Sequence, residues 1–432
     1  MKKQTLLVLL MSALLVTGCA KPAAESNESE QPTSNESQEV TPSSEIENES
    51  SEQELSSSEE QSSSSTNQWG GFSWGGWGQS STQTSSAAPI ETQTAPDNDI
   101  HTDLQYTYLQ DPDWRNIKAY VPTVNAERSG SGVEQSKPKA LKLAFSDVAD
   151  ASTYYVQVSK DNTFAGAEVL TTTVKEYELW NAEIATKYYY RAAVSEKALA
   201  SASIKEFQVA DLAPRNLKVD GMINFRDIGG WKSSLVPNGV VKQGLYYRCA
   251  QFDNNGRATI TTAGKAEIKR LGIKLDIDMR DRPPSSSSAS STDWQVDILD
   301  AHIASGTEST RWEGFADVYK KIFEAIAVSD QKPIALHCTH GADRTGIASF
   351  FLLALLGVSV EDCGRDYCYT RFAGERKVLP ADEFDNWVNK TQALQGETFA
   401  DKMYNHLLSK GISANTLETI RELYVPGYHR AA

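Results

Sequence analysis

The fold is decided by one stretch, PIALHCTHGADRTG, at residues 333–346. It opens with a short apolar run that ends in a histidine, which is typical of a buried strand. From about Thr345 the pattern becomes helical, and Gly341 allows a turn between the two parts. We therefore expect a strand at 333–337, a tight loop, and a helix that begins near Thr345.

The sequence on either side alternates strand-like and helical patterns. Apolar runs at 244–248 and 274–279 predict two further strands. Helices are predicted at 261–271, capped by Thr262, and at 315–327. Such alternation is typical of an α/β domain, so we predict a largely parallel central sheet flanked by helices over residues 212–432.

A loop between a strand end and a helix start favours anion binding. It aims backbone N–H groups and the positive end of the helix dipole at one point, where a phosphate fits. Cys338 lies at the foot of this loop, and the same field favours its thiolate, which is the nucleophilic form. Arg344, in the same loop, can hold two phosphate oxygens with its planar guanidinium. The pattern predicts that Cys338 attacks phosphorus while Arg344 grips the phosphate.

The other residues of the loop have supporting roles in this prediction. Gly341 lets the backbone turn with its amides inward, and the Thr345 hydroxyl can hydrogen-bond the thiolate. His337 is expected to orient the loop. The expected phosphate-binding residues are the loop and its arginine: Thr339, His340, Gly341, Ala342, Asp343 and Arg344.

The string His-Cys-x5-Arg-Thr-Gly resembles the signature of the protein tyrosine phosphatase superfamily. Other segments are similar in order and spacing to its bacterial tyrosine phosphatase branch, from about Asn216 to Val425. They are 223–230, 244–249, 275–280, 366–367 and 411–413. The resemblance implies a phosphoric monoester hydrolase in which Cys338 forms a phosphocysteine that water then hydrolyses. No cofactor is expected, and no cluster in the sequence has metal-site spacing.

The chain departs from that branch at two positions. Its loop reads His340-Gly341-Ala342-Asp343 where relatives carry a lysine, which puts activity on phosphoinositides in doubt, although a protonated His340 would partly replace that charge. Cys249 stands where relatives carry a small hydroxyl residue, and we interpret it as a packing residue, like Cys363 and Cys368. With so few cysteines, no disulfide framework is expected.

Two aspartates are candidates for the acid that protonates the leaving group. Asp343 lies in the loop at the position proposed for the acid in the resembling branch, and a carboxyl beside a phosphate keeps its proton more readily. Asp300 lies where many tyrosine phosphatases carry their acid, but without a Trp-Pro-Asp signature. We favour Asp343 and keep Asp300 as the alternative. The remaining charged residues of the matching segments are expected to be architectural: Asp227, Asp278 and Arg280.

Two other functions stay open at this stage. The same scaffold can serve a phosphatase of inositol polyphosphates such as phytate, which needs a wide pocket with a basic rim. Alternatively, the loop captures phosphorylated ligands without turnover, and the chain is a surface binding protein. The intact pair of Cys338 and Arg344 favours an enzyme, with a phosphotyrosine protein or a small phosphomonoester as substrate.

The N-terminus is typical of an exported protein. Lys2 and Lys3 precede the apolar run 6–16, which is too short to span a bilayer. Val16-Thr17-Gly18-Cys19 resembles the end of a bacterial lipoprotein signal, which implies a signal peptide at 1–19 and a lipid on Cys19. The alternative is an ordinary cleaved signal with an incidental cysteine. The lipoprotein interpretation predicts an anchor on the extracytoplasmic face of a bacterial cell membrane.

Residues 20–100 are predicted to be a disordered linker, because Ser, Glu, Gln and Asn dominate the first part. Residues 69–78 place four aromatics between glycines; we interpret them as a spacer, with an adhesive patch for the envelope as the alternative. Twelve glutamates lie in residues 20–68, so most of the net charge of −15 is there. The rest of the chain lacks a dense Lys/Arg stripe, which excludes nucleic acid as a partner.

Residues 115–211, between the linker and the α/β domain, contain short strand-like runs. They lie at 141–145, 154–158, 168–170 and 188–194 and predict a small antiparallel β-sandwich. Thr186-Lys-Tyr188 resembles the tyrosine corner of fibronectin type III domains. No catalytic pattern is visible in this part. Such modules are spacers or binding surfaces, so an envelope component or a protein is the expected partner.

Overall fold

The computed structural model describes residues 92–121, 134–145, 151–253, 259–281, 296–304, 308–374 and 381–430. All of them belong to one compact unit, Gln83–Ala432. The predicted signal peptide with Cys19 and the aromatic part of the linker lie outside the described residues. Among the helices of the described part, none is long and apolar enough to cross a membrane.

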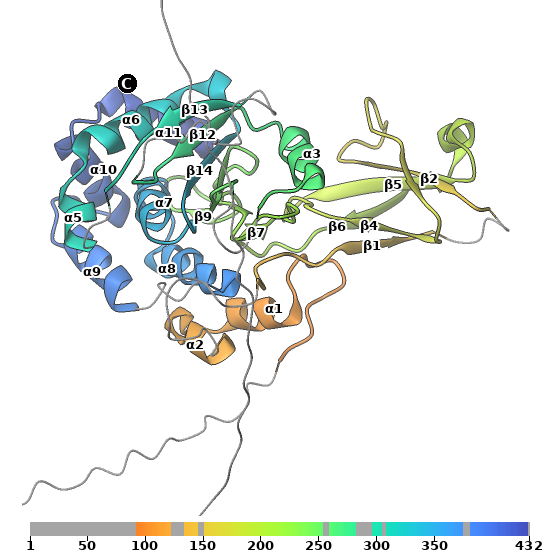
Figure 1. Cartoon of the computed structure of the whole chain (residues 1–432), viewed down its shortest axis with the longest axis horizontal. Coiled ribbons are helices and arrows are strands. Elements are labelled where there is room, and N and C mark those ends of the chain that lie inside the picture. The colour runs from red at the N-terminus through yellow and green to blue at the C-terminus, as the bar shows by residue number, and fades with distance from the viewer. Residues whose placement is uncertain are drawn as a thin grey trace, which may run out of the picture. The chain divides into compact units, whose positions relative to one another are not determined.

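A six-stranded sheet forms the centre of the α/β domain (Figure 1). Its strands are β7 (Arg215–Asn216), β8 (Arg226–Asp227), β11 (Tyr246–Ala250), β12 (Leu275–Asp278), β13 (Asp297–Asp300) and β14 (Ile334–Cys338). The order is β13-β12-β14-β11-β8-β7; the first four strands are parallel, and β8 and β7 are antiparallel. The mixed, largely parallel sheet confirms the predicted α/β class, and the three predicted strands correspond to β11, β12 and β14.

Side chains of the sheet alternate between two buried faces, as parallel strands require. On one face, Leu336 and Cys338 of β14 join a large core that several helices complete. On the other face, Ala335 joins a smaller core with Ile268 of α3 (Thr262–Arg270). The helices of the large core include α6 (Ala316–Ala327), α7 (Asp343–Leu355), α8 (Val360–Tyr369), α9 (Ala381–Gln392), α10 (Phe399–Ser409) and α11 (Ala414–Tyr424).

The helices begin within two residues of their predicted starts. Thr261, not the predicted Thr262, caps α3, because its Oγ1 accepts a hydrogen bond from Gly264 N at 3.1 Å. α6 begins one residue after the predicted start because Phe315 has a positive φ of 58°. α7 begins at Asp343, earlier than the expected start near Thr345. The remaining short elements are α5 (Glu308–Glu313), η3 (Ser329–Gln331), η4 (Thr370–Ala373), β9 (Lys232–Ser233) and β10 (Gly239–Val240).

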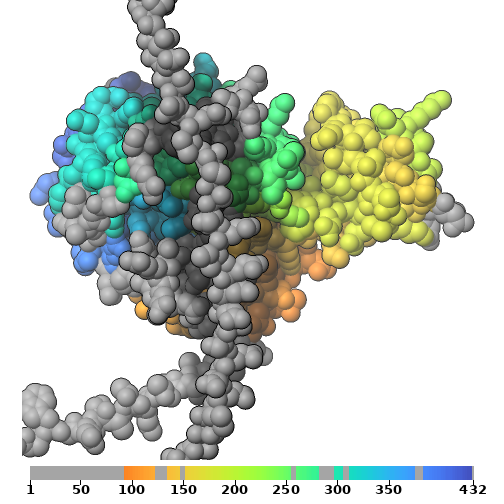
Figure 2. All heavy atoms as spheres, in the orientation of Figure 1, coloured from red at the N-terminus to blue at the C-terminus, as the bar shows by residue number. Residues whose placement is uncertain are grey.

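Residues 141–208 form two antiparallel sheets, β1–β4 and β3-β2-β5-β6. The elements are β1 (Leu141–Ala144), β2 (Tyr154–Ser159), β3 (Leu170–Thr172), β4 (Glu176–Leu179), β5 (Lys187–Ala193), η2 (Glu196–Ser201) and β6 (Lys205–Gln208). Tyr188 Oη accepts a hydrogen bond from Glu183 N at 2.9 Å, the contact expected of a tyrosine corner. Likeness to a fibronectin type III domain stays a prediction. Figure 2 shows the atoms of this strand-rich segment against those of α3.

The first described elements are helical: α1 (Asp103–Gln110), η1 (Trp114–Asn116) and α2 (Ile117–Tyr120). Their apolar side chains Tyr108, Trp114 and Ile117 belong to the large core of the α/β domain. In Figure 1, α1 and α2 are drawn below α8, and η1, between them in the sequence, packs against α8. The predicted start of the sandwich, residue 115, falls inside this helical stretch, and the first strand of the described residues begins at Leu141.

Candidate active site

Cys338 is the last residue of β14 and lies at the carboxyl end of the parallel strands. Ligands of open α/β sheets bind outside this end. The cysteine is 3% exposed and pairs in register with Ala250 of β11. Residues 339–342 connect it to α7, so the N-terminus of that helix, with its positive dipole end, follows the loop directly.

The loop is held through its carbonyl groups. Asn224 Nδ2 donates to the carbonyl oxygens of His340 and Gly341, both at 3.1 Å. Arg248 Nη2 donates to the same Gly341 oxygen at 2.9 Å. In a trans peptide the N–H points away from the C=O, so the N–H groups of Gly341 and Ala342 face the opposite side of the loop. Amides turned to one side in this way form an anion-binding concavity.

Gly341 is the residue that permits this loop path. Its φ is +68°, and a Cβ added to it would lie 2.3 Å from the carbonyl oxygen of Cys249. Both the backbone conformation and the close approach of β11 therefore require glycine.

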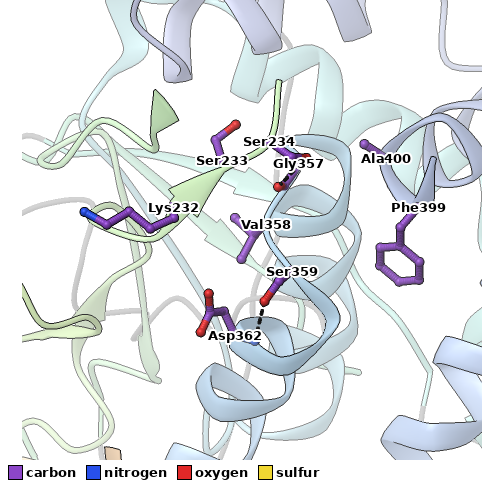
Figure 3. Close-up of a pocket in the computed structure, with 9 residues that line it drawn as sticks. All are labelled: Lys232, Ser233, Ser234, Gly357, Val358, Ser359, Asp362, Phe399 and Ala400. Carbon is purple, nitrogen blue, oxygen red and sulfur yellow. Dashed lines mark hydrogen bonds between the residues drawn. The ribbon is translucent and has the colours of Figure 1, made fainter. Parts of the chain in front are cut away.

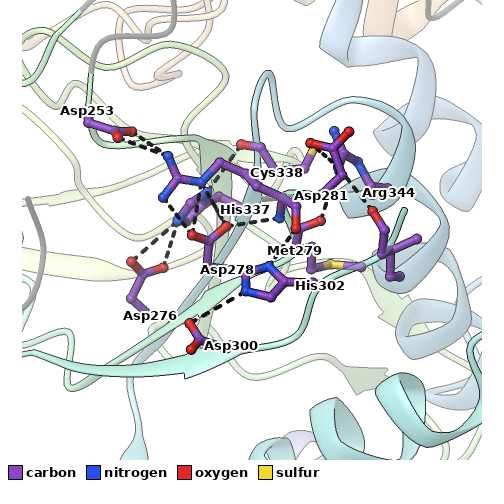
Figure 4. A network of polar contacts seen from close by, with 12 residues as sticks. Asp253, Asp276, Asp278, Met279, Asp281, Asp300, His302, His337, Cys338 and Arg344 are labelled. Carbon is purple, nitrogen blue, oxygen red and sulfur yellow. Dashed lines mark hydrogen bonds and ion pairs between the residues drawn. The ribbon is translucent and has the colours of Figure 1, made fainter. Parts of the chain in front are cut away.

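Arg344 lies in the first turn of α7, and its guanidinium reaches over the ends of the neighbouring strands (Figure 4). Nη1 donates to the carbonyl oxygens of Met279 at 3.3 Å and Ile303 at 3.2 Å. The carboxylate of Asp281 lies 3.9 Å from the same nitrogen. These contacts fix the guanidinium at the end of the sheet that carries Cys338.

His337 points to the face of β14 opposite to Cys338 and lies among carboxylates (Figure 4). Its Nε2 is 3.3 Å from Asp276 Oδ2, and its Nδ1 is 3.9 Å from Asp278 Oδ1 and 3.2 Å from the Cys338 carbonyl oxygen. Burial disfavours a charged ring, but the two carboxylates outweigh it and raise the pKa of His337 to about 9. The residue before the cysteine is therefore positively charged at neutral pH.

Asp278 and Arg280 brace the end of β12. Arg280 Nη2 donates to Asp278 Oδ2 at 2.6 Å, and its Nη1 donates to both oxygens of Asp253 at 2.9 Å. Burial raises the pKa of Asp278, but the charges of His337 and Arg280 lower it by a larger amount, so the net shift is downward. Asp227 of β8 binds Arg215 Nη1 of β7 at 2.9 Å, at the antiparallel edge of the sheet. These contacts fit the architectural roles predicted for the three residues.

The two predicted acids lie in different places. Asp343 is half-buried at the start of α7. Burial lowers the pKa of Arg311, but the hydrogen bond to Glu383 and the charge of Asp343 outweigh it, so the net shift is upward. Burial raises the pKa of Tyr367, and the charges of Glu383 and Asp343 add to that shift. The Asp300 side chain is 45% exposed and lies 4.0 Å from His302 Nε2. Because β12 separates β13 from β14, Asp300 is two strand spacings, about 10 Å, from the strand of Cys338.

The remaining predicted residues also lie around the loop. The carbonyl of Thr339 accepts from Gln251 N at 3.2 Å, and that of Ala342 accepts from Gly346 N at 2.7 Å. The Thr345 hydroxyl is buried without a hydrogen-bond partner among the described residues, so its expected hydrogen bond to Cys338 is not formed here. The four described cysteines are buried and free.

Several polar residues of this site received no individual role from the sequence: Asn224, Arg248, Asp276, Asp281 and Asp366. A usable signal exists for Asp276. The run Leu275-Asp-Ile-Asp278 alternates acid and apolar residues, so both acids lie on one face of β12, the face that His337 shares in the neighbouring strand. Asn224 and Asp366 lie in segments that resemble the family, but the sequence does not show what they contact, because their partners are distant in sequence.

The described residues also form a cavity away from Cys338, of about 300 Å³ (Figure 3). It is lined by Lys232, Ser233, Ser234, Gly357, Val358, Ser359, Asp362, Phe399 and Ala400. It lies at the C-terminal end of α7, a helix about 20 Å long, and thus far from the loop. Within the described ranges, no group of three or more His, Cys, Asp or Glu residues could hold a metal ion.

Comparison with known proteins matches residues 217–430 to the tyrosine phosphatase family. The match spans just under half of the chain, and this part of the chain is similar to that family. A tyrosine-protein phosphatase of Nostoc commune is 28% identical over 145 residues, 29% of this chain and 49% of that protein. A protein of Cupriavidus necator, also named as a tyrosine-protein phosphatase, is 27% identical over 176 residues, which are 35% of this chain and 62% of that protein. The chain thus spans about half to two thirds of the length of these relatives.

Among solved structures, the chain is similar to TpbA of P. aeruginosa, with 14% identity and a TM-score of 0.28. The alignment covers 42% of this chain and 96% of that one. The family match begins and ends close to the limits expected from the sequence, Asn216 and Val425.

Gly341→Ala is expected to abolish binding of inorganic phosphate. The new methyl must displace β11 or the loop, in addition to the cost of a left-handed residue, about 1–2 kcal/mol of unfolding free energy. Gly272→Ala is the matched control, because Gly272 has φ +69° and open space around its added Cβ. Calorimetric titration with phosphate and urea unfolding measure both effects. Undiminished phosphate binding by Gly341→Ala would contradict the role given to this backbone.

His337 is expected to titrate near pH 9 in the folded protein. Because its pKa is raised from 6.5, its proton contributes stability that is complete below about pH 6.5 and is lost as the pH rises through 9. Ring ¹⁵N chemical shifts in a Cys338→Ser chain, which lacks the thiol that would titrate nearby, measure this pKa. Asp276→Asn should lower it. A midpoint near 6.5 in the chain with Asp276 intact would disprove the charge assigned to His337.

Proposed function

We propose that this chain is a phosphoric monoester hydrolase that acts through a phosphocysteine on Cys338. One observation carries the proposal. A cysteine at the end of β14, a loop bound through its carbonyls and an arginine from the following helix meet at one end of the sheet. Loop N–H groups and Arg344 suit the oxygens of a phosphate, which leaves phosphorus in front of the sulfur. The match of residues 217–430 to the tyrosine phosphatase family supports the same reaction.

In the first step, the sulfur of Cys338 attacks phosphorus in line with the leaving oxygen. An S–P bond forms as the P–O bond breaks, and Asp343 gives its proton to the leaving alcohol or phenol. Arg344 and the loop N–H groups bind the equatorial oxygens, on which negative charge is spread in the transition state.

In the second step, water attacks the phosphorus of the phosphocysteine. Asp343, now ionised, takes a proton from the water as the new O–P bond forms. The S–P bond breaks, which returns Cys338 as a thiolate and releases inorganic phosphate. The same side chain thus acts first as acid and then as base.

Asp343 is the acid that we propose, because it lies in the turn that also carries Arg344. Asp300 is two strands from Cys338 in the sheet, and Asp281 is turned to the guanidinium of Arg344. An acid matters most for a poor leaving group. Asp343→Asn should therefore slow phenyl phosphate hydrolysis far more than p-nitrophenyl phosphate hydrolysis, and an equal effect on both would argue against this assignment.

The charges at this end of the sheet support a singly phosphorylated substrate. Of the described arginines, Arg280 is bound by Asp253 and Asp278, which neutralise it. Asp281 lies next to Arg344, so the rim of the described site is not basic. Such a rim disfavours inositol polyphosphates. We therefore propose a phosphotyrosine protein or a small phosphomonoester as substrate.

The location remains a proposal that rests on the sequence. The lipoprotein-like start of the chain supports a lipid anchor at Cys19 and a position on the extracytoplasmic face of the membrane. A Cys19→Ser chain that stays in the membrane fraction would contradict it. An envelope component or a protein as partner of the strand-rich segment is likewise proposed from the sequence alone. A pull-down with residues 134–211 would test it.

Hydrolysis of p-nitrophenyl phosphate by the full chain, with EDTA present throughout, tests the function. We expect turnover by the natural chain and a loss on the order of a thousandfold or more in Cys338→Ser, because no other group replaces the nucleophile. Phosphate affinity of Cys338→Ser, measured by calorimetry, controls for an intact loop. A natural chain that binds phosphate but hydrolyses no aryl phosphate, phytate or phosphoinositide would instead be a binding protein.

A further inference from the structure

Asp366 of α8 organises the two arginines behind the loop. Its side chain accepts hydrogen bonds from Arg226 Nε at 2.8 Å and Arg248 Nη1 at 2.5 Å. Arg248 is the donor to the Gly341 carbonyl, and Arg226 Nη1 donates to Asn224 Oδ1, which orients the other donor. One carboxylate on α8 thus sets the position of both side chains that hold the loop.

The same carboxylate keeps two buried positive charges together. Burial and the neighbouring Arg248 lower the pKa of Arg226 to about 10, and Asp366 counteracts both effects. Arg226, Arg248 and Asp366 are each at most 1% exposed, so solvent screens none of this repulsion. A displacement of α8 that moved Asp366 would release the arginines, and with them the loop.

The other side of α8 is covered by residues 100–121, which we call the N-terminal clasp. Gly364 approaches the indole of Trp114 so closely that an added Cβ would lie 2.7 Å from a ring atom. Arg365 Nη2 donates to the carbonyl oxygen of Asp111 at 2.5 Å. On a helix, residues two apart point about 200° apart, so Gly364 and Asp366 face nearly opposite sides.

The clasp also fixes the segment that follows α8. Arg371 Nε donates to the carbonyl oxygen of Val121 at 2.8 Å. The ring of Tyr108 packs against those of Tyr369 and Phe372, with centroids 6.4 Å and 5.6 Å away. The clasp precedes β1 in the sequence, so a fragment that starts after the strand-rich segment lacks it.

We propose that the N-terminal clasp is a positioning element of the phosphate loop, which it holds through α8 and Asp366. The kinetic part of this proposal rests on the proposed function. The clasp touches neither Cys338 nor Arg344 among its described contacts, so it acts only through the position of the loop carbonyls. The catalytic unit is therefore discontinuous in sequence, with the strand-rich segment inserted between its first helices and its sheet.

The test uses the full chain with Gly364→Ala and the double variant Gly364→Ala with Trp114→Phe. Trp114→Phe alone is the reference for the double variant. The Gly364→Ala methyl pushes Trp114 and α8 apart, and we expect kcat/KM on p-nitrophenyl phosphate and affinity for inorganic phosphate to fall on the order of tenfold. Trp114→Phe in the same chain makes room for the methyl and should restore most of both losses. Ile420→Val, at a buried position of α11, is the control for a loss of stability without displacement of α8. Its kcat/KM and its phosphate affinity should both stay within about twofold of those of the natural chain.

The outcomes separate this proposal from the proposed function. Unchanged kcat/KM and phosphate affinity in folded Gly364→Ala would overturn the clasp proposal. If the natural chain binds phosphate but hydrolyses nothing, the proposed function fails and phosphate affinity alone decides on the clasp. If the natural chain neither binds phosphate nor hydrolyses an aryl phosphate, both fail. Should Gly364→Ala not fold, Arg365→Gln takes its place, because it removes the hydrogen bond to the Asp111 carbonyl. Weaker phosphate binding than in Ile420→Val then supports the clasp, and equal binding overturns it.

Discussion

The carbonyl oxygens of His340 and Gly341 must point away from the anion, and this constraint shapes much of the surrounding structure. A buried carbonyl without a donor costs about 1–3 kcal/mol, so amides can face a phosphate only if donors wait on the other side. Asn224 and Arg248 are those donors. Asn224 comes from the residues just before β8, and Arg248 comes from β11. The antiparallel part of the sheet thus supplies one of the two donors.

Two buried ionic clusters flank Cys338, one on each side of β14. His337 with Asp276 and Asp278 lies on the face of α3, while Arg226 and Arg248 share Asp366 on α8. Buried ion pairs add little net stability, because desolvation offsets their attraction, but removal of one partner costs about 3–5 kcal/mol. They are thus better suited to fix positions than to stabilise the fold.

Much of the site could be predicted because its chemistry is local in sequence. Cys338, the turn at Gly341 and Arg344 lie within one strand-loop-helix stretch, and the strands at 244–248, 274–279 and 333–337 follow from their apolar runs. The support of the loop could not be predicted in this way. Asp366, Asn224 and the clasp act on the loop through contacts with distant residues, and a residue such as Trp114 looks like any core aromatic until Gly364 is seen against it. The helical stretch around residue 115 was missed for the same reason, since short helices depend on tertiary packing.

The proposed reaction passes through a covalent bond between the sulfur of Cys338 and phosphorus. Rapid mixing of the natural chain with p-nitrophenyl phosphate, quenching within one turnover and mass analysis of the peptides locate that bond directly. We predict one added phosphoryl group on the peptide that contains residues 333–346, attached to Cys338 and absent from Cys338→Ser. A phosphoryl group on His337, His340 or Asp343, or turnover without any phosphorylated peptide, would contradict the mechanism.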